Sequence, residues 1–386
     1  MTGHRSVRSR PVATTVRVEV LERGVKPPQT KAVKGHRTPK SEAPVPMVNT
    51  ILREHLARLV RRENLTRGEA TGLLEAMLED DATDAQIAAT LVALSAKGET
   101  VEELAGMADA LRERAVKVSS SHTAFIDTAG TGSSRAKTFN VSTAAAFVIA
   151  GAGLAVAKHG NRAASSKSGS ADVLTALGVN VSALVKVSED CLNETGICFM
   201  FAPLYHGATA RVAGIRRELG VHTTFNLLGP LSNPAMAPRQ IIGVWRRDLV
   251  ELLANVAVAL GTERAWVVHG EDGLDEITLA GKTHVAEAHD GAVKTFEITP
   301  QDFGLSESSL DQLRGGDAEA NALIIREVLS LERRDEARAL IVINAAAALF
   351  VGGKAETLID AARMAQQSLD SGAAKMKLEQ LIKATN

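Results

Sequence analysis

The sequence predicts an α/β protein in which a small α-helical domain precedes a large α/β domain with a central, mostly parallel sheet covered by helices. Apolar residues first recur at helical spacing over residues 48–118. Beyond them, short apolar strands that end in glycine turns alternate with helices, a pattern typical of parallel sheets. With 386 residues, 45% of them apolar, the chain can bury one large core or two smaller ones. We therefore divide it into residues 1–46, 47–118 and 119–386.

Residues 1–46 are predicted to be a disordered basic extension. They hold ten Lys and Arg against three Asp and Glu, and six of the eleven prolines, without sustained periodicity. A targeting peptide, a nucleic-acid-binding arm, or a start codon assigned too early, with the true start at Met47, would each explain this composition. Because the whole chain has a net charge of −1, the remainder is acidic, and we expect no nucleic-acid partner for it.

Residues 47–118 are predicted to form four helices. Three threonines are each followed three residues later by Glu or Gln, which indicates capping boxes at Thr66, Thr83 and Thr100. Gly98 is placed to end the helix that precedes the last of these boxes. We expect helices from about residues 200–230 to join this domain.

The α/β domain is predicted over residues 119–386. We expect strands at residues 124–130, 154–160, 240–245 and 264–272, and helices at residues 143–153, 170–179 and 249–261. No apolar run of about 18 residues occurs, so no membrane span is expected. Two cysteines are too few for a disulfide framework or a zinc site, so we expect both to be buried, in a cytoplasmic protein.

Two glycine-rich turns follow neighbouring strands, and ligands of open α/β sheets bind beyond such strand ends. At the first turn, Gly130 allows close approach of the backbone, while Ser142 and Thr143 begin a helix whose N–H groups and dipole favour anions. Either turn alone is common in α/β proteins, and neither the dinucleotide fingerprint nor the P-loop pattern is present. Together they indicate a ligand with two phosphate centres. The second turn adds Lys158, Arg162, Ser165, Ser166, Lys167 and Ser170.

Two further stretches carry residues suited to chemistry. The acidic residues Asp275 and Glu276 follow a predicted strand and offer the hard oxygen ligands that suit Mg²⁺, although an ordinary acidic loop would look the same. Arg216 can hold a carboxylate through a bidentate pair, although a solvated helix face is the common alternative. His206 and His222 lie nearby in sequence, where a structural histidine is the more common case.

From about Met47 to the C-terminus, the chain resembles the anthranilate phosphoribosyltransferase family. The stretches that carry the resemblance are KHGNRAASSKSGSADVLTALGV, RRELGVHTTFNLLGPLSNPA, HGEDGLDEI and GGDAEANALIIREVL. The resemblance implies an enzyme of tryptophan biosynthesis. It would transfer the phosphoribosyl group of phosphoribosyl pyrophosphate to the amine of anthranilate, giving N-(5-phosphoribosyl)anthranilate and pyrophosphate. It also implies Mg²⁺ as cofactor and a homodimer paired through the helical domain.

The resemblance also implies roles for particular residues. Metal ligands would be Ser142, Asp275 and Glu276. Anthranilate would be held by Gly130, Asn161 and Arg216, with His159 and His206 along its path. His159 and Arg216 would be positioning residues, with no covalent nucleophile. The phosphoribosyl donor would be held by Gly130, Ser133, Ser134, Thr138, Asn140, Ser142, Thr143, Lys158, Asn161, Arg162, Ser166 and Ser170.

The sequence departs from the family pattern at three places. Ser133 and Ser134 stand where a Gly-Asp pair is usual, and Gly207 and Gly214 stand where prolines are usual. The first change alters a turn expected to bind phosphate, and the other two lie near the expected anthranilate path. A divergent transferase for another aromatic acceptor, or a non-catalytic nucleic-acid-binding paralogue, therefore stays open. Pyrimidine nucleoside phosphorylases share the general fold but differ in the Lys-His-Gly-Asn-Arg loop.

Overall fold

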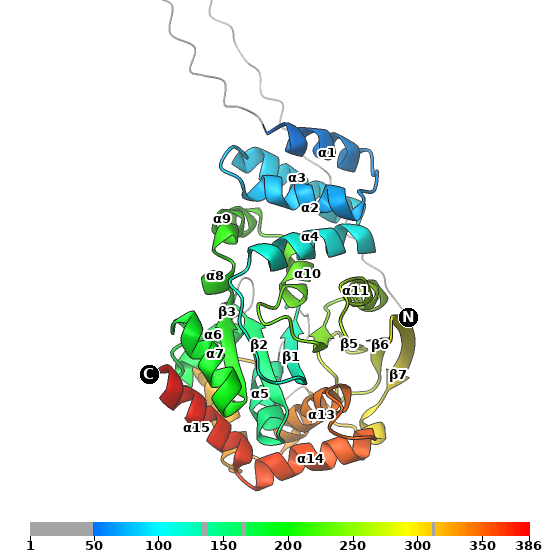
Figure 1. Ribbon diagram of the computed structural model, residues 1–386. Coiled ribbons are helices and arrows are strands. Elements are labelled where there is room, and N and C mark those ends of the chain that lie inside the picture. Colours follow the sequence, from blue (N-terminus) through cyan, green and yellow to red (C-terminus); the bar gives the residue numbers. More distant parts are fainter. Residues whose placement is uncertain (1–48, 133–137, 164–166, 311–312) are drawn as a thin grey trace, which may run out of the picture. The chain divides into compact units, whose positions relative to one another are not determined.

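The computed structural model describes residues 49–132, 138–163, 167–310 and 313–386 (Figure 1). Within this part, a group of helices is followed by a larger α/β region built on one seven-stranded sheet. This confirms the predicted fold class. The extension predicted to be disordered, residues 1–46, lies outside the described residues.

The four N-terminal helices form where the sequence predicts them. The capping boxes at Thr66, Thr83 and Thr100 are confirmed, each with the threonine hydroxyl accepting from the backbone N–H three residues on. Gly98 ends its helix with a positive φ of 86°, as its lack of a Cβ allows. These helices are α1 (Thr50–Val60), α2 (Arg67–Leu78), α3 (Asp84–Lys97) and α4 (Val101–Arg114).

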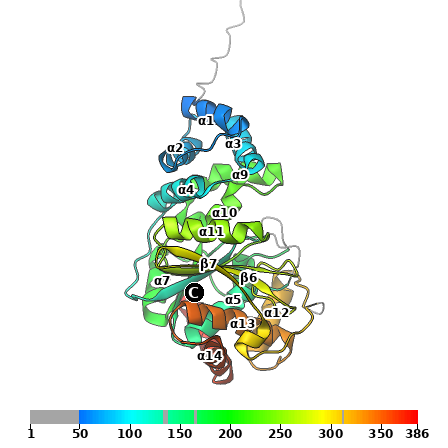
Figure 2. The same cartoon turned by 90° about the vertical axis from the view of Figure 1, so that its right-hand side faces the viewer.

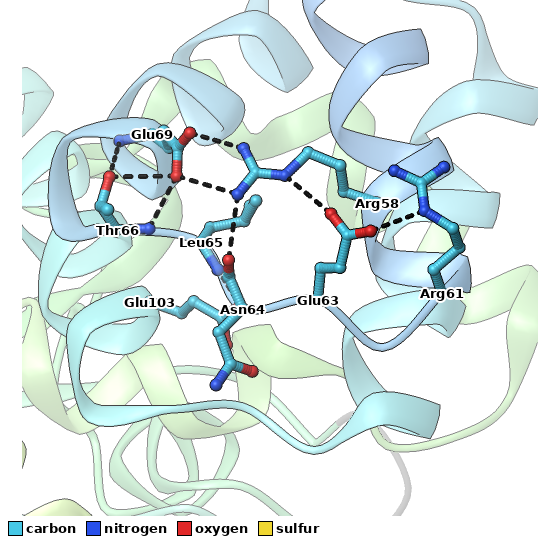
Figure 3. A network of polar contacts seen from close by, with 8 residues as sticks. All are labelled: Arg58, Arg61, Glu63, Asn64, Leu65, Thr66, Glu69 and Glu103. Atoms are coloured by element: carbon cyan, nitrogen blue, oxygen red, sulfur yellow. Dashed lines mark hydrogen bonds and ion pairs between the residues drawn. The ribbon is translucent and has the colours of Figure 1, made fainter.

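Charged side chains close the connection between α1 and α2 (Figure 3). The Arg58 guanidinium pairs with Glu69 at 2.5 Å and with Glu63 at 3.3 Å, and it also donates to the Asn64 carbonyl at 3.1 Å. The bond from Arg58, aided by the N–H of Thr66, lowers the pKa of Glu69 to about 2. Arg58, in α1, thus bonds both to the loop between α1 and α2 and to the first turn of α2.

A second group of helices from the middle of the chain packs on the first. α9 contacts α2 and α3, and α10 contacts α3 and α4 (Figure 1). This joins residues from the 200–230 region to the helical region. The elements are α8 (Ala202–Tyr205), η2 (Gly207–Thr209), α9 (Ala210–Leu219) and α10 (Thr224–Leu231).

The sheet has the strand order β3-β2-β1-β4-β5-β6-β7. The first five strands are parallel, whereas β6 and β7 are antiparallel to their neighbours. The carboxyl ends of the parallel strands therefore meet along one edge. The strands are β1 (Phe125–Gly130), β2 (Ala155–Gly160), β3 (Ile197–Phe201), β4 (Arg239–Gly243), β5 (Arg264–Gly270), β6 (Thr283–His289) and β7 (Ala292–Ile298).

The sheet separates two hydrophobic cores, and alternate residues of its strands belong to each. Ile241 and Trp266 face the core shared with α5 (Val141–Gly151) and α13 (Glu336–Val351). Ile242 and Val267 face the core shared with α11 (Asp248–Ala259), α10 and the N-terminal helices. Figure 2 shows α11 on one side of the sheet and α13 on the other. The helical region is thus continuous with one face of the sheet.

The remaining elements complete the large region. Cys191 and Cys198 are buried and free, as expected. None of the helices in the described ranges is long and apolar enough to cross a lipid bilayer. The other elements are α6 (Ser170–Ala176), α7 (Val185–Asp190), η1 (Cys191–Thr195), η3 (Pro300–Phe303), α12 (Ala318–Leu329), α14 (Leu358–Asp370) and α15 (Ala373–Thr385).

Candidate active site

The acidic stretch lies over the carboxyl ends of β1 and β4. A Cβ built on Gly243 would overlap the backbone of Asp275, and one on Gly130 would lie 3.5 Å from the Asp275 carboxylate. Glycine at position 243 therefore lets the Asp275 segment approach the sheet edge closely, whereas the distance at Gly130 is an ordinary van der Waals contact. The structure thus brings Asp275 to the first glycine-rich turn, more than a hundred residues away in the sequence.

Glu276 meets the start of α5. The backbone N–H of Ser142 donates to Glu276 Oε1 at 3.1 Å. From the neighbouring strand, Lys158 Nζ donates to the Ser142 hydroxyl at 3.3 Å and to the Thr128 carbonyl. The first turn, the second strand and the acidic stretch therefore meet around Ser142.

At this meeting point Lys158 is buried, and Asp275 and Glu276 are partly buried. Burial, followed by the negative charge of Asp275, raises the pKa of Glu276 to about 8, while Lys158 opposes both effects. Burial also lowers the pKa of Lys158, against the charges of Asp127 and Glu276. A cation between the two carboxylates would relieve their repulsion.

The donor set fits Mg²⁺. Asp275, Glu276 and the Ser142 hydroxyl are hard oxygen donors. Across the described ranges, no three His, Cys, Asp or Glu side chains gather as a metal site. A protein offering one or two carboxylates suits an ion that keeps waters and takes its other ligands from substrate phosphates.

Residues of the first turn reach segments far along the chain. Asn140 occupies the N-cap position of α5 but makes no side-chain cap. Its Oδ1 accepts instead from Ser168 at 3.3 Å and from Asn321 at 3.0 Å. Thr138 donates to the Leu313 carbonyl at 2.8 Å. The predicted site residues Ser133, Ser134 and Ser166 lie outside the described residues.

Asp172 organises the second turn. Its carboxylate accepts from the backbone N–H groups of Ala163 and Gly169, each at 3.0 Å, and from the Arg162 guanidinium at 2.8 Å. Ser170 donates to the carbonyl of Asn161 at 3.3 Å. Asn161, Arg162 and Ser170 are thus brought together by α6. Arg162, predicted as a phosphate ligand, is paired here with Asp172.

Two buried histidines lie side by side next to this turn. The ring centroids of His159 and His206 are 5.1 Å apart. His159 Nδ1 is 3.3 Å from the carbonyl of Gly229 in α10, and the Nε2 atoms of both rings have no partner among the described residues. Burial lowers the pKa of both, that of His159 to about 3. Both imidazoles are therefore neutral at physiological pH.

Arg216 also contacts α10. It donates to Asn226 of α10 at 3.1 Å, one turn from Gly229, and its guanidinium lies 5.4 Å from the centre of the Phe225 ring. Its Nε is buried without a partner among the described residues, and no acidic side chain of those residues acts on its charge. Burial lowers its pKa. The arrangement suits an incoming carboxylate, which would supply the missing acceptor and charge.

Three residues that hold parts of the site in place were not predicted from the sequence. Asp127 is fully buried in β1 and accepts from the N–H of His159 at 3.1 Å and from Asn233 at 2.7 Å. Asn344 of α13 both accepts from and donates to the backbone of Ile277, each at 2.9 Å. Asn321 is described above. The available signal was a polar residue inside an otherwise apolar strand or helix.

Comparisons with known proteins show the family to which the chain belongs. A family model described as the glycosyl transferase family, a/b domain, matches residues 122–375, and the helical bundle domain of the same family matches residues 53–115. An anthranilate phosphoribosyltransferase from Anaeromyxobacter dehalogenans is 52% identical over 87% of this chain and 99% of its own.

Solved structures give the same result. The anthranilate phosphoribosyltransferase of Thermus thermophilus matches with a TM-score of 0.81 and 38% identity, over 86% of this chain and 98% of its own. The Saccharomyces cerevisiae enzyme, in complex with PRPP and Mg, matches with a TM-score of 0.79 and 28% identity, over 87% of this chain and 98% of its own.

Proposed function

The chain belongs to the anthranilate phosphoribosyltransferase family, and from this premise we propose how its site carries out the reaction. The enzyme transfers the phosphoribosyl group of phosphoribosyl pyrophosphate to the amine of anthranilate, in tryptophan biosynthesis. The relatives support this function rather than a nucleic-acid-binding paralogue or a transferase for another acceptor. The observation that carries the assignment of the site is the contact of Glu276 with Ser142 at the start of α5.

We assign the phosphoribosyl donor to the two glycine-rich turns. Its two phosphate centres would lie against the start of α5 and the second turn, where N–H groups, hydroxyls and Lys158 supply donors. Ser142, Asp275 and Glu276 would hold Mg²⁺, in keeping with their hard oxygen donors and buried charge. When bound, the ion would neutralise charge on the departing pyrophosphate. The other donor residues assigned are Gly130, Thr138, Asn140, Thr143, Asn161, Arg162 and Ser170, with Ser133, Ser134 and Ser166 proposed from sequence alone.

Anthranilate would lie between Arg216 and the two histidines. Its carboxylate would pair with Arg216, whose partners within the described residues include no acid. The neutral rings of His159 and His206 would line its path without adding charge. Gly130 and Asn161 would hold its other side.

The chemistry needs positioning more than a strong base. The aromatic amine is neutral at pH 7 and loses its proton readily after attack. Holding the amine in line with C1 of the ribose can supply up to about 7–11 kcal/mol in favourable cases. The chain's own part is therefore to fix two substrates and to stabilise charge on the leaving group.

We also propose a homodimer paired through the helical region. An apolar groove of about 380 Å³ runs between α1 and α3. Val60 and Val92, on its rim, are 70% and 44% exposed. A second copy would cover these residues. The cytoplasmic location expected from the sequence stays a prediction.

The test is to mix the protein with anthranilate, phosphoribosyl pyrophosphate and Mg²⁺ and to follow the loss of anthranilate fluorescence with and without the metal. We expect metal-dependent loss. If fluorescence persists while the phosphoribosyl donor still binds, the acceptor assignment is wrong, and Gly207 and Gly214 are the residues to replace by proline first.

A further inference from the structure

The segment that leads into α12 returns to the first glycine-rich turn. Thr138 forms an isolated antiparallel bridge with Arg314, and its hydroxyl donates to the carbonyl of Leu313 at 2.8 Å. A Cβ on Gly315 would overlap the carbonyl of Thr138, so only glycine allows this approach. A segment distant in sequence is thus built against the donor-binding turn.

Asn321 joins this segment to the turn with both ends of its amide. The side chain is 3% exposed and lies in the first turn of α12. Its Oδ1 accepts from the N–H of Gly316 at 2.8 Å, and its Nδ2 donates to Asn140 Oδ1 at 3.0 Å. Nothing in the local structure of α12 requires this, because Asp317 already caps that helix by accepting from the N–H of Ala320.

The contact with Asn321 determines which hydrogen bonds the side chain of Asn140 makes. An asparagine at an N-cap normally accepts from the backbone N–H two or three residues on. Here the Asn140 oxygen is taken by Asn321 and by the hydroxyl of Ser168 in the second turn. The side-chain oxygen of Asn140 therefore accepts from no N–H group of α5. The N–H groups of Thr143 and Ala144 donate to the backbone carbonyl of Asn140, and that of Ser142 donates to Glu276.

We propose that Asn321 is a positioning residue for the phosphoribosyl donor. It holds the Asn140 side chain, at the start of α5, in a fixed position between α12 and the second turn. Through Asn140 and Ser168 it also fixes the first turn relative to the second. This inference rests on the assignment of both turns to the phosphoribosyl donor.

Two variants test it. Asn321→Asp keeps an acceptor for Gly316 but cannot donate to Asn140, and Asn321→Ala removes both bonds. The matched control is Ser368→Ala, which removes the 2.8 Å bond from α14 to the carbonyl of Val148, in the second half of α5. The control thus perturbs a buried contact between a C-terminal helix and α5 without touching the turns.

We expect Asn321→Asp to raise the KM for phosphoribosyl pyrophosphate about tenfold, with a much smaller change in the KM for anthranilate. Calorimetric affinity for the donor, with Mg²⁺ present, should fall by the same factor. Ser368→Ala should lower Tm and leave both KM values near those of the wild type.

The proposal is overturned if Asn321→Asp, folded by its circular dichroism, keeps the wild-type affinity for the donor. It is also overturned if both KM values rise equally, since a general loosening would do that. Should Asn321→Ala fail to fold, Asn321→Asp still decides. If the wild type binds the donor but does not consume anthranilate, the proposed function fails while the calorimetry still tests Asn321.

Discussion

Arg216 is an arginine whose buried Nε has no partner among the described residues, and whose only side-chain hydrogen bond there goes to Asn226. We expect Arg216→Ala to raise the KM for anthranilate by one to two orders of magnitude, because a charge-assisted hydrogen bond contributes about 1.5–3 kcal/mol. The KM for phosphoribosyl pyrophosphate should change little. Steady-state kinetics with each substrate varied in turn measures both values.

Arg217→Ala is the matched control, because this neighbouring arginine is exposed. It removes the same charge from the same helix without opening the proposed carboxylate site. If Arg216→Ala changed both KM values equally, or if Arg217→Ala had the same effect, the carboxylate role of Arg216 would be wrong.

His159 should make stability depend on pH. Its pKa is about 3 in the folded protein, below its ordinary value of 6.5. Between these values the unfolded chain binds a proton that the folded chain does not, so the free energy of unfolding decreases as pH falls below about 6.5. The slope from this one group is at most about 1.4 kcal/mol per pH unit.

The comparison is with His159→Asn, which can still donate to Gly229 but does not titrate. We expect the stability advantage of the wild type over this variant to shrink by roughly 2 kcal/mol between pH 7 and pH 5. Urea unfolding at both pH values measures it. Asp127, Lys158 and His206, the ionisable groups around His159, are present in both proteins. Parallel pH profiles would show that His159 is not held neutral.

The helix α9 carries Arg216 and also Gly214, where the family usually has proline. A Cβ on Gly214 would meet no atom within 4 Å, so alanine fits there without strain. We expect Gly214→Ala to stabilise the protein by about 0.5–1 kcal/mol, because glycine weakens a helix interior by that amount. Thermal unfolding measures the increase in Tm.

The control is at the C-terminal end of the same helix, α9. Gly220 also has nothing within 4 Å, but its φ is +62°. Alanine there must adopt a left-handed conformation, so Gly220→Ala should lower Tm. If Gly214→Ala lowered Tm as well, α9 would not be the regular helix described above. A rise in Tm with a fall in kcat would indicate that α9 must bend during turnover.

The helix α13 holds the acidic stretch through Asn344. Asn344→Leu has a similar volume but leaves the N–H and carbonyl of Ile277 without partners, so Asp275 and Glu276 should lose their fixed position. We expect calorimetric binding of phosphoribosyl pyrophosphate to need several-fold more Mg²⁺. Asn321→Asp is the contrast, because its weaker donor binding should persist at saturating Mg²⁺. An unchanged Mg²⁺ requirement in Asn344→Leu would contradict this role.

Local signals predicted those elements whose structure is decided locally. The threonine capping boxes and Gly98 fixed the helices of the N-terminal region, and the glycine turns marked the ends of β1 and β2. The strands β3, β6 and β7 were missed, although Asp290-Gly291, between β6 and β7, has positive φ at both residues, the signature of a tight hairpin turn. The alternating pattern of β6 and β7 lacked the apolar run that marks parallel strands such as β3.

The site could be predicted only in part, for a physical reason. Glycine, hydroxyl and acidic residues that lie close together in the sequence indicate a ligand-binding site. Asn321 and Asn344 act across long sequence separations, and a single amide within a helix gives no indication of its partner. Asp127 likewise looks like an ordinary strand residue until the neighbouring strand places the His159 N–H against it.

The homodimer that we propose for the whole chain depends on the apolar groove between α1 and α3. Val92 lies on its rim at 44% exposure, and Val60 faces it from α1 at 70%. A carboxylate at residue 92 would have to be desolvated at an interface between two copies, which costs several kcal/mol when no partner charge is present. We expect the wild type to sediment at twice the mass of the 40.7 kDa chain and Val92→Glu to sediment as a monomer.

Leu184→Glu is the matched control, since Leu184 is also an exposed apolar residue, at 77%, but lies before α7 in the large region. It should leave the assembly unchanged. Sedimentation equilibrium over a range of protein concentrations distinguishes the outcomes. A dimeric Val92→Glu would place the interface elsewhere, and a monomeric wild type would mean that the groove is open in the working enzyme. The active site should still turn over in the Val92→Glu monomer, because every residue assigned to it comes from one chain.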